Sequence, residues 1–205
     1  GTVNLPANAG GYHVWYGVCC RNGTIKNLNN PLNTGEMFYV YVPGNAIWYE
    51  DFNLAQNTTS DVGTTKWSRT LGATPPNYAR VNATQSFEFS GAAGATATWT
   101  STTITISQYP AGVNLSAVLS QSGNNMENTD SIFIYYSLNG GAQTLFTTNG
   151  KLGGNIASTT STANNLIGNT IQIIVKVKYD GSTTTSELFR LDDVTVKPSC
   201  SSNWV

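Results

Sequence analysis

Charged side chains are scarce in this chain of 205 residues, which contains 10 Lys and Arg, 11 Asp and Glu and a single His. Together Asp, Glu, Lys and Arg make up 10% of the sequence, whereas roughly 25% is usual for soluble domains. The net charge is −1, and no run of basic residues occurs. Because binding to phosphate backbones needs clustered Lys and Arg, we do not expect nucleic acid as a partner.

Long apolar runs are also missing. No apolar run approaches the roughly 18 residues that a membrane-spanning helix needs, so we expect no membrane span. Ser, Thr, Asn and Gly take the place of charged residues, and this composition favours short strands joined by polar turns over long helices. The sequence therefore predicts an all-β protein, with ample length to bury a core.

Residues for catalysis are few. A Ser-His-Asp or Cys-His nucleophile would have to use His13, the sole histidine, and no nucleophile elbow accompanies it. A glycosidase needs two carboxylates on either side of its substrate, and the sequence does not indicate which two of its acids would serve. We therefore predict that the protein is not an enzyme.

The three cysteines, Cys19, Cys20 and Cys200, lack the spacing of a zinc site. Neighbouring residues on a strand point to opposite faces, so one of the adjacent pair can bond to Cys200 while the other packs inward. We predict a disulfide between Cys20 and Cys200, with Cys19 as the alternative partner. An odd cysteine count is compatible with an oxidising compartment but does not establish one.

Short runs rich in β-branched and aromatic residues recur between turn signals such as Asn139-Gly140-Gly141. This regular spacing predicts a β-sandwich. Residues 155–165 are rich in Ser, Thr and Asn and are expected to form a surface loop. The expected strands cover residues 87–89, 97–101, 104–106, 113–119, 131–138, 144–146, 171–178 and 186–196.

Two acidic pairs interrupt strand-like runs: Glu50-Asp51, just before Phe52, and Asp192-Asp193 in the last strand. An ionised carboxylate cannot be buried without a partner, so each pair needs a cation, a helix terminus or an exposed position. Calcium takes six to eight oxygen ligands, which carboxylates, backbone carbonyls and water can provide together. The alternative is that all four acids are solvated edge residues.

The acidic-Asp-Phe opening and the hydrophobic-Asp-Asp-Val-x-Val close resemble extracellular β-jelly rolls of the carbohydrate-binding-module, MAM and cleaved-adhesin type, over residues 48–197. The resemblance implies an antiparallel two-sheet jelly-roll sandwich whose first and last strands are neighbours and share a structural Ca2+. The implied ligands are Glu50, Asp51, Asp192 and Asp193. Asp192 is favoured because Val194 and Val196 share its strand parity, unless a β-bulge transfers the role to Asp193.

Residues 1–46 are expected to form a separate β-strand segment, before a jelly-roll domain at 47–198 and a tail at 199–205. The run Cys19-Cys20-Arg21-Asn22 and the residues after it resemble a motif in large surface proteins of gliding Bacteroidetes. That resemblance implies a secreted or cell-surface multidomain parent. The strands of this segment have no core of their own, so they must pack on this chain or on a neighbouring one.

Glycan binding needs flat aromatic rings beside polar groups, because sugar C–H faces stack on rings and hydroxyls need fixed partners. Four aromatics in polar or loop-like surroundings are the candidates: Trp67, Tyr78, Tyr109 and Tyr179. The preferred function is a non-catalytic extracellular binding or adhesion module for a polysaccharide or cell-surface glycan. The alternatives are a self-assembling filament or surface-layer protein joined by strand pairing, and an accessory domain of a polysaccharide-degrading enzyme.

Overall fold

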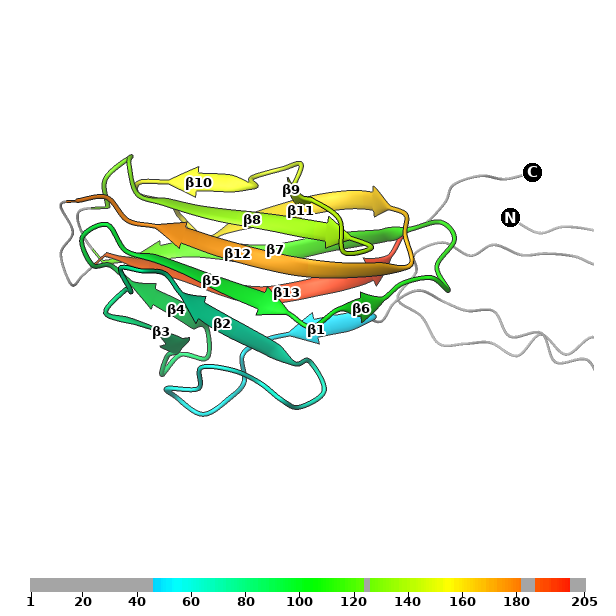
Figure 1. Cartoon of the computed structure of the whole chain (residues 1–205), viewed down its shortest axis with the longest axis horizontal. Helices are drawn as coiled ribbons and strands as arrows, with labels where there is room; N and C mark the ends of the chain where they lie inside the picture. The colour runs from blue at the N-terminus through cyan, green and yellow to red at the C-terminus, as the bar shows by residue number, and fades with distance from the viewer. Residues whose placement is uncertain (1–45, 124–125, 182–186, 200–205) are drawn as a thin grey trace, which may run out of the picture. The chain divides into compact units, whose positions relative to one another are not determined.

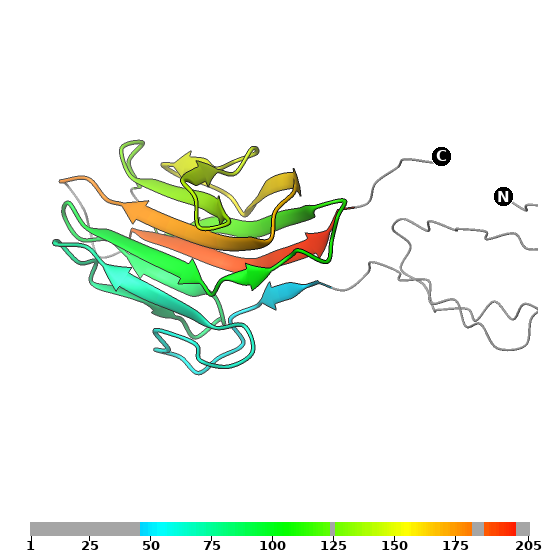
Figure 2. The same ribbon diagram turned by 45° about the vertical axis from the view of Figure 1, so that its right-hand side comes forward.

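The structure is a computed structural model that describes residues 46–123, 126–181 and 187–199. Within these ranges the chain forms thirteen strands and no helix. All the strand pairs are antiparallel, and they divide into two sheets, which we name sheet A and sheet B. The two sheets lie face to face as a jelly-roll sandwich (Figure 1, Figure 2), which confirms the fold class predicted from the sequence.

Sheet A has the order β11-β7-β13-β4-β3, with β1 paired to β13. Its strands are β1 (Trp48–Glu50), β3 (Tyr78–Val81), β4 (Phe87–Ser90), β7 (Val113–Ser122), β11 (Thr159–Leu166) and β13 (Leu188–Pro198). The first and last strands of the described domain are therefore neighbours, as the resemblance implied.

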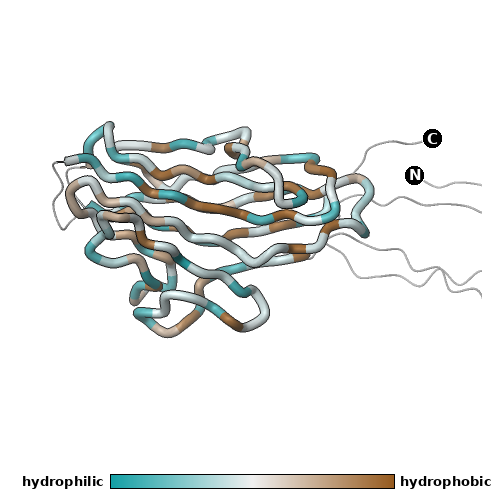
Figure 3. Tube along the Cα trace, in the orientation of Figure 1, coloured by the Kyte–Doolittle hydropathy of each residue, from teal (hydrophilic) through white to brown (hydrophobic). Residues whose placement is uncertain are grey.

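Sheet B has the order β10-β8-β12-β5-β2, with β6 paired to β12 and β9 paired to β8. Its strands are β2 (Trp67–Leu71), β5 (Thr96–Ser101), β6 (Ile104–Thr105), β8 (Ser131–Leu138), β9 (Gln143–Leu145), β10 (Lys151–Gly153) and β12 (Thr170–Lys178). Figure 3 shows the apolar residues concentrated on the central strands, most continuously along β12.

Side chains from the inward faces of both sheets form one core. At its centre Phe52, Trp67, Phe87 and Trp99 pack edge-on or tilted, with ring centroids 5.1–6.1 Å apart. Each of these side chains is at most 3% exposed. Full burial of one large apolar side chain contributes about 1.5–3 kcal/mol, so this cluster is a main source of stability. Trp48 and Trp99 lie in the core, as their strand neighbours indicated.

Four strands of the fold differ from the sequence-based expectation. Residues 159–165, expected to lie within a surface loop, belong to β11, which pairs with β7. The reason is that Ser161 and Ala163 face the core and are fully buried, and small or polar residues on an inward face leave no hydrophobic alternation to recognise. The strands β2, β3 and β10 were not expected either, and each is placed by pairing with a neighbouring strand.

Several expectations concern residues that lie outside the described ranges. These are the β-strand segment 1–46, the tail beyond residue 199 and all three cysteines, so the domain boundaries and the Cys20–Cys200 disulfide stay predictions. Within the described residues no helix is long and apolar enough to cross a membrane.

Candidate functional site

A row of alternating charges crosses the outer face of sheet A. Glu88 on β4 pairs in register with Arg80 on β3 and with Arg190 on β13. The neighbouring residues Phe87 and Phe89 point into the core and are fully buried, so the side chains in this row face outward by strand alternation. Strand register thus places an arginine on each side of Glu88, and Arg190 is the one that forms an ion pair with it.

Glu88 is the hub of this row, although its side chain is almost entirely buried. Its Oε2 accepts hydrogen bonds from Arg190 Nε at 2.6 Å and from Asn82 Nδ2 at 3.2 Å. Its Oε1 accepts one from the Tyr78 hydroxyl at 2.8 Å. Burial, followed by the nearby Glu88 carboxylate, raises the pKa of Tyr78, so its hydroxyl stays protonated as a donor.

These residues line a cavity of about 240 Å3, which we name the Tyr78 groove. The Arg80 guanidinium lies 4.2 Å from the centroid of the Tyr78 ring, where it makes a cation–π contact. Arg190 keeps 31% of its side chain exposed even though its Nε is bonded to Glu88. The other lining residues used below are Gln56, Asn82 and Thr84. The groove therefore offers an aromatic ring together with guanidinium, amide and hydroxyl groups.

The structure places the four predicted ligand-binding aromatics very differently. Tyr78 lines the groove, and Tyr109 is half-buried in the loop after β6, where it packs against the core. Trp67 is 3% exposed in the aromatic cluster, and Tyr179 is 1% exposed with its hydroxyl donating to the Phe89 carbonyl. Trp67 and Tyr179 have no ring face to offer a ligand, so the sequence-based expectation was wrong for these two residues.

The sequence reasoning missed Arg80, Glu88 and Arg190 as groove residues. A signal was present, because Tyr78-Ala79-Arg80-Val81 and Phe87-Glu88-Phe89 both alternate outward polar with inward apolar residues. The pairing of β4 with β13 was not visible in the sequence, since it joins Glu88 to Arg190 across about a hundred residues.

The carboxylates predicted to bind calcium come from β1, β13 and the residues after β1. Glu50 pairs in register with Val194 and is 3% exposed. Its Oε1 accepts a hydrogen bond from the Phe52 amide at 2.7 Å, and its Oε2 accepts one from the Thr65 hydroxyl at 2.7 Å. Burial raises the pKa of Glu50, and these two hydrogen bonds oppose the shift. Thr65 also donates to Asp61 Oδ2 at 3.2 Å, which adds a carboxylate that the sequence reasoning had not included.

A β-bulge interrupts β13 between Asp192 and Thr195. It reverses the parity on which the preference for Asp192 rested, because Leu191 and Val194 are both fully buried in the core. Asp193 adopts the left-handed conformation (φ 48°), is exposed, and accepts a hydrogen bond from the Tyr49 hydroxyl at 2.5 Å. The sequence favoured Asp192 as a ligand unless a β-bulge was present, and the structure contains that bulge.

Asp192 remains half-buried beside this bulge. Burial is the main cause that raises its pKa to about 6, and the carboxylates of Asp193, Asp51 and Glu50 add to the shift. In the described part of the chain, the one ion pair within 4.0 Å joins Arg190 to Glu88, so no cationic side chain offsets this group of acids. Phe52 also takes the left-handed conformation (φ 52°), which is costly for a bulky residue.

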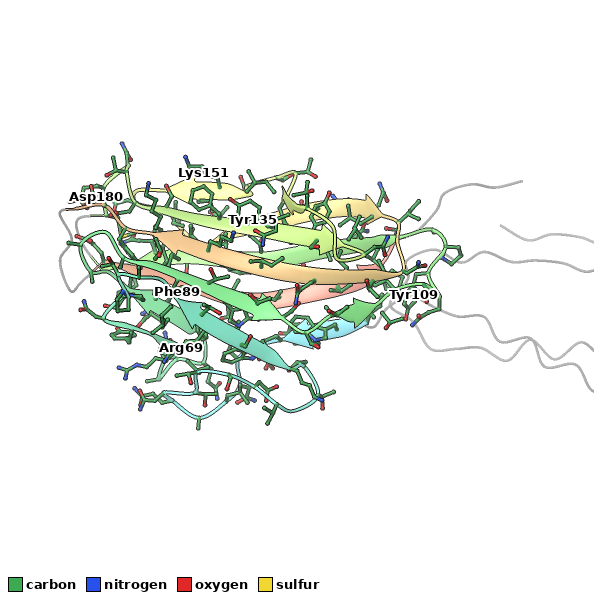
Figure 4. All side chains as sticks on the ribbon, viewed as in Figure 1. Arg69, Phe89, Tyr109, Tyr135, Lys151 and Asp180 are labelled. Carbon is green, nitrogen blue, oxygen red and sulfur yellow. The ribbon has the colours of Figure 1, made fainter. Side chains whose placement is uncertain are left out.

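A second group of acids joins the start of β8 to the end of β12. Carboxylate oxygens of Glu127, Asp130 and Asp180 lie within 4.8 Å of one another. Asp130 is fully buried and accepts hydrogen bonds from the amides of Asp180 at 2.8 Å and Glu127 at 3.3 Å. Asp180 lies at the opposite end of the sandwich from Tyr109 (Figure 4). Backbone donors already hold Asp130 in place, and the cluster serves below as a control for the acids on β1 and β13.

No family model and no curated protein matches the chain. Among solved structures, it is similar to a family 61 carbohydrate-binding module in complex with beta-1,4-galactotriose, with 14% identity, a TM-score of 0.42, and coverage of 65% of this chain and 88% of the other. It is also similar to the K3 cleaved adhesin domain of Lys-gingipain from Porphyromonas gingivalis, with 15% identity, a TM-score of 0.36, and coverage of 70% and 98%.

A third similar structure is the glycoside hydrolase domain of Endo-D from Streptococcus pneumoniae R6, with 15% identity and a TM-score of 0.45. The match covers 74% of this chain but only 28% of that one. Because all three matches have low identity and TM-scores under 0.5, a functional argument has to come from the residues of this chain.

Proposed function

We propose that the protein is a non-catalytic extracellular module that binds carbohydrate at the Tyr78 groove. The observation that carries this proposal is the Glu88 hub, which fixes an aromatic ring and a partly exposed guanidinium group on the wall of one cavity. A sugar presents C–H faces that stack on rings and hydroxyls that need fixed hydrogen-bond partners, and the groove provides both.

The hydrogen bonds to Glu88 support binding because they hold the side chains of Tyr78 and Arg190 in place before a ligand arrives. Arg190 has five N–H donors, and Nε is the one committed to Glu88, so the terminal donors are available to a ligand hydroxyl. The side chain is already held in one orientation, which lowers the entropy lost on binding. Amide and hydroxyl groups of Gln56 and Thr84 add donors and acceptors at the rim.

The composition of the groove favours binding without cleavage. Among the residues that line it, Glu88 is the one carboxylate, and its two oxygens are engaged by Tyr78, Asn82 and Arg190. Glycoside hydrolysis generally needs two carboxylates about 5–10 Å apart, one of which must exchange a proton with the substrate. A carboxylate held by three donors is suited to positioning side chains instead.

The experiment that tests this proposal has two parts. The full chain is screened against neutral and charged polysaccharides, and each binder is then incubated with the protein and analysed for released sugar. We expect at least one polysaccharide to bind and no shorter sugar to appear. Release of oligosaccharides from a bound polymer would contradict the proposal.

We also propose a structural Ca2+ at the acids of β1 and β13. By strand parity the bulge would favour Asp193, but Asp193 is exposed and bonded to Tyr49, so we take the half-buried Asp192 with Glu50 as the central ligands. Asp51, Asp193 and Asp61 are the other carboxylates close by. Support comes from the donor chemistry, because hard oxygen ligands suit calcium and Glu50 and Asp192 are buried or half-buried without a cationic side chain within 4.0 Å among the described residues. Among the described acids, Glu127, Asp130 and Asp180 are the one group of three whose ligand atoms lie within 4.8 Å of one another, so an ion at β1 and β13 would also need backbone carbonyls and water as ligands. When bound, the ion would neutralise the acids and hold β1 against the bulge of β13.

A further inference from the structure

The two sheets carry opposite charge. The seven strands of sheet B contain Arg69, Lys151, Lys176 and Lys178 but no acidic residue. The strands of sheet A contain four acids, Glu50, Glu88, Asp192 and Asp193, and three basic residues, Arg80, Arg190 and Lys197, so their formal charge is −1 against +4 for sheet B. Arg69 points away from the outer face of sheet B, because it donates a hydrogen bond to the Ala79 carbonyl on sheet A. The three lysines remain on the outer face.

Strand register arranges the outer face of sheet B in rows across the strands. The first row is Lys151, Phe133, Lys176, Thr98 and Thr70, on β10, β8, β12, β5 and β2. The second row is Leu145, Tyr135, Ile174, Thr100 and Ser68, in which β9 takes the place of β10. Each row therefore changes from large apolar side chains at one end to hydroxyl-bearing side chains at the other, and the first row also carries two lysines. Figure 4 shows Lys151 and Tyr135 on this face, over β10 and β8.

Phe133 and Tyr135 form an aromatic platform on this face. Their rings are nearly parallel, with an interplanar angle of 17° and centroids 6.1 Å apart. Both side chains are only half-buried, because the alternate residues Ile132 and Ile134 are the ones that enter the core. The neighbouring Ile174 is 3% exposed although it points outward and is not part of the core cluster, so the platform shields an apolar floor.

A lysine stands beside each ring of the platform. Lys151 Nζ lies 5.4 Å from the centroid of Phe133, and Lys176 Nζ lies 5.3 Å from the centroid of Tyr135. Cation–π contacts of this kind hold the ammonium groups near the rings while leaving their hydrogen-bond donors to solvent. In the described residues no carboxylate pairs with either lysine within 4.0 Å.

The hydroxyl-bearing end of the rows opens into a depression of about 460 Å3. Ser68, Thr100, Gln172 and Lys66 line it. Asp61 also lies on its wall, where its carboxylate accepts hydrogen bonds from the Gly63 amide and the Thr65 hydroxyl. A polymer that crossed the sheet would thus meet rings, ammonium groups and then hydroxyl and amide groups in turn.

We infer that the outer face of sheet B binds an acidic polysaccharide, a chain of sugars that carry carboxylates. The rings of Phe133 and Tyr135 would stack on the C–H faces of the sugars, while Lys151 and Lys176 would bind their carboxylates. The Thr and Ser hydroxyls of β5 and β2 would meet the uncharged hydroxyls. This site lies on the other sheet from the Tyr78 groove and specifies an acidic glycan, so the inference goes beyond the proposed function.

The arrangement fits a polyuronate better than other polyanions. Nucleic acid carries a charge at every phosphate and needs dense basic clusters, whereas this face spaces three lysines among rings and hydroxyls. A sugar chain with one carboxylate per unit has a matching, lower charge density and the C–H faces that the platform needs. Attraction to a polyanion also weakens with salt, because screening acts on exposed charges.

The test measures binding of polygalacturonate to the full chain at low and high salt. Fully methyl-esterified polygalacturonate is the control ligand, because it has the same sugar chain without the carboxylate charges. The variants are Lys151→Gln with Lys176→Gln, and Phe133→Ala with Tyr135→Ala. Lys197→Gln is the control for the loss of a single lysine charge, because it removes one from an exposed position on sheet A, and the single substitutions Lys151→Gln and Lys176→Gln are compared with it. Melting temperatures show whether each variant is folded.

We expect polygalacturonate to bind, to bind at least tenfold more weakly when fully esterified, and to weaken with added salt. Each double substitution should reduce affinity about tenfold or more, whereas Lys197→Gln should leave it within twofold. Failure of the wild-type protein to bind polygalacturonate would overturn the inference, as would undiminished binding by both folded double variants. If the variant Phe133→Ala with Tyr135→Ala does not fold, the affinity of the variant Lys151→Gln with Lys176→Gln decides whether the inference holds.

The same measurements separate this inference from the proposed function. Tyr78→Ala should leave polygalacturonate binding unchanged. If Tyr78→Ala abolishes it, the polymer binds in the Tyr78 groove and the inference about sheet B is wrong. If no polysaccharide depends on Tyr78 but polygalacturonate binding depends on Lys151 and Lys176, the groove proposal fails and the sheet B site stands.

Discussion

Replacing Glu88 by alanine should destabilise the protein through the loss of a hydrogen-bond hub. The substitution removes the acceptor for Tyr78 at 2.8 Å, Arg190 at 2.6 Å and Asn82 at 3.2 Å. Neutral hydrogen bonds contribute about 1 kcal/mol each, and bonds to a charged group contribute about 1.5–3 kcal/mol. Added together without correction, the three bonds would exceed the cost that we expect.

The expected cost is lower because the orphaned donors are not sealed from water. The side chain of Arg190 is 31% exposed, so water can solvate its guanidinium group after the substitution, and an exposed ion pair is worth little. We therefore expect Glu88→Ala to lower the free energy of unfolding by about 2–3 kcal/mol, below the sum of the three contributions. For a domain of this size each kcal/mol lowers the melting temperature by about 2–4 °C.

Urea-induced unfolding measures this cost, with Glu88→Gln as the matched control. Glutamine keeps one acceptor oxygen without the charge, so it should lose about half as much stability as alanine. A double-mutant cycle with Arg190→Ala should give a coupling energy of at least about 0.5 kcal/mol, as residues in one network do. If the unfolding free energy of Glu88→Ala stays within about 0.5 kcal/mol of wild type, the claim that the hydrogen bonds to Glu88 stabilise the fold is refuted.

Two further predictions concern the calcium site and the cysteines. Chelation should lower the melting temperature of the wild type but not of Asp192→Ala, because an ion bound only to the folded state stabilises it by roughly 3–4 kcal/mol at 100- to 1,000-fold excess over its Kd. If Asp130→Asn rather than Asp192→Ala removes the effect of chelation, the ion binds at the Glu127, Asp130 and Asp180 cluster instead. Peptide mapping under non-reducing conditions should recover Cys200 bonded to Cys20, or to Cys19 as the alternative, and closing so long a loop contributes at most about 5 kcal/mol. A free Cys200 thiol would contradict that bond.

The sheets of this protein were predictable where hydrophobic alternation was strong. The runs that became β7, β8 and β12 alternate or are continuously apolar, so local pattern alone identified them. β11 escaped notice because Ser161 and Ala163 fill its inward positions, and its place is set by pairing with β7. Tertiary pairing therefore decided the structure where the local pattern was weak.

The candidate sites were likewise predictable where the local sequence was distinctive and not where strand pairing brings residues together. Glu50 and Asp192 could be identified from the sequence, because a charged residue inside an apolar, strand-like run needs a partner if it is buried. The Tyr78 groove was only partly predicted, since its ring was a candidate but Glu88 and Arg190 meet it through strand register. Trp67 was misjudged because Lys, Ser and Arg surround it in the sequence, although its side chain points inward to the aromatic cluster.

The most direct test of carbohydrate binding at the groove is a calorimetric titration with the best binder from the screen. It compares wild type, Tyr78→Ala and Tyr78→Phe. One stacked ring contributes on the order of 1 kcal/mol, so Tyr78→Ala should weaken binding roughly fivefold or more. Tyr78→Phe keeps the ring and should retain most of the affinity. If Tyr78→Ala stays folded and binds as tightly as wild type, the Tyr78 groove is not the carbohydrate site.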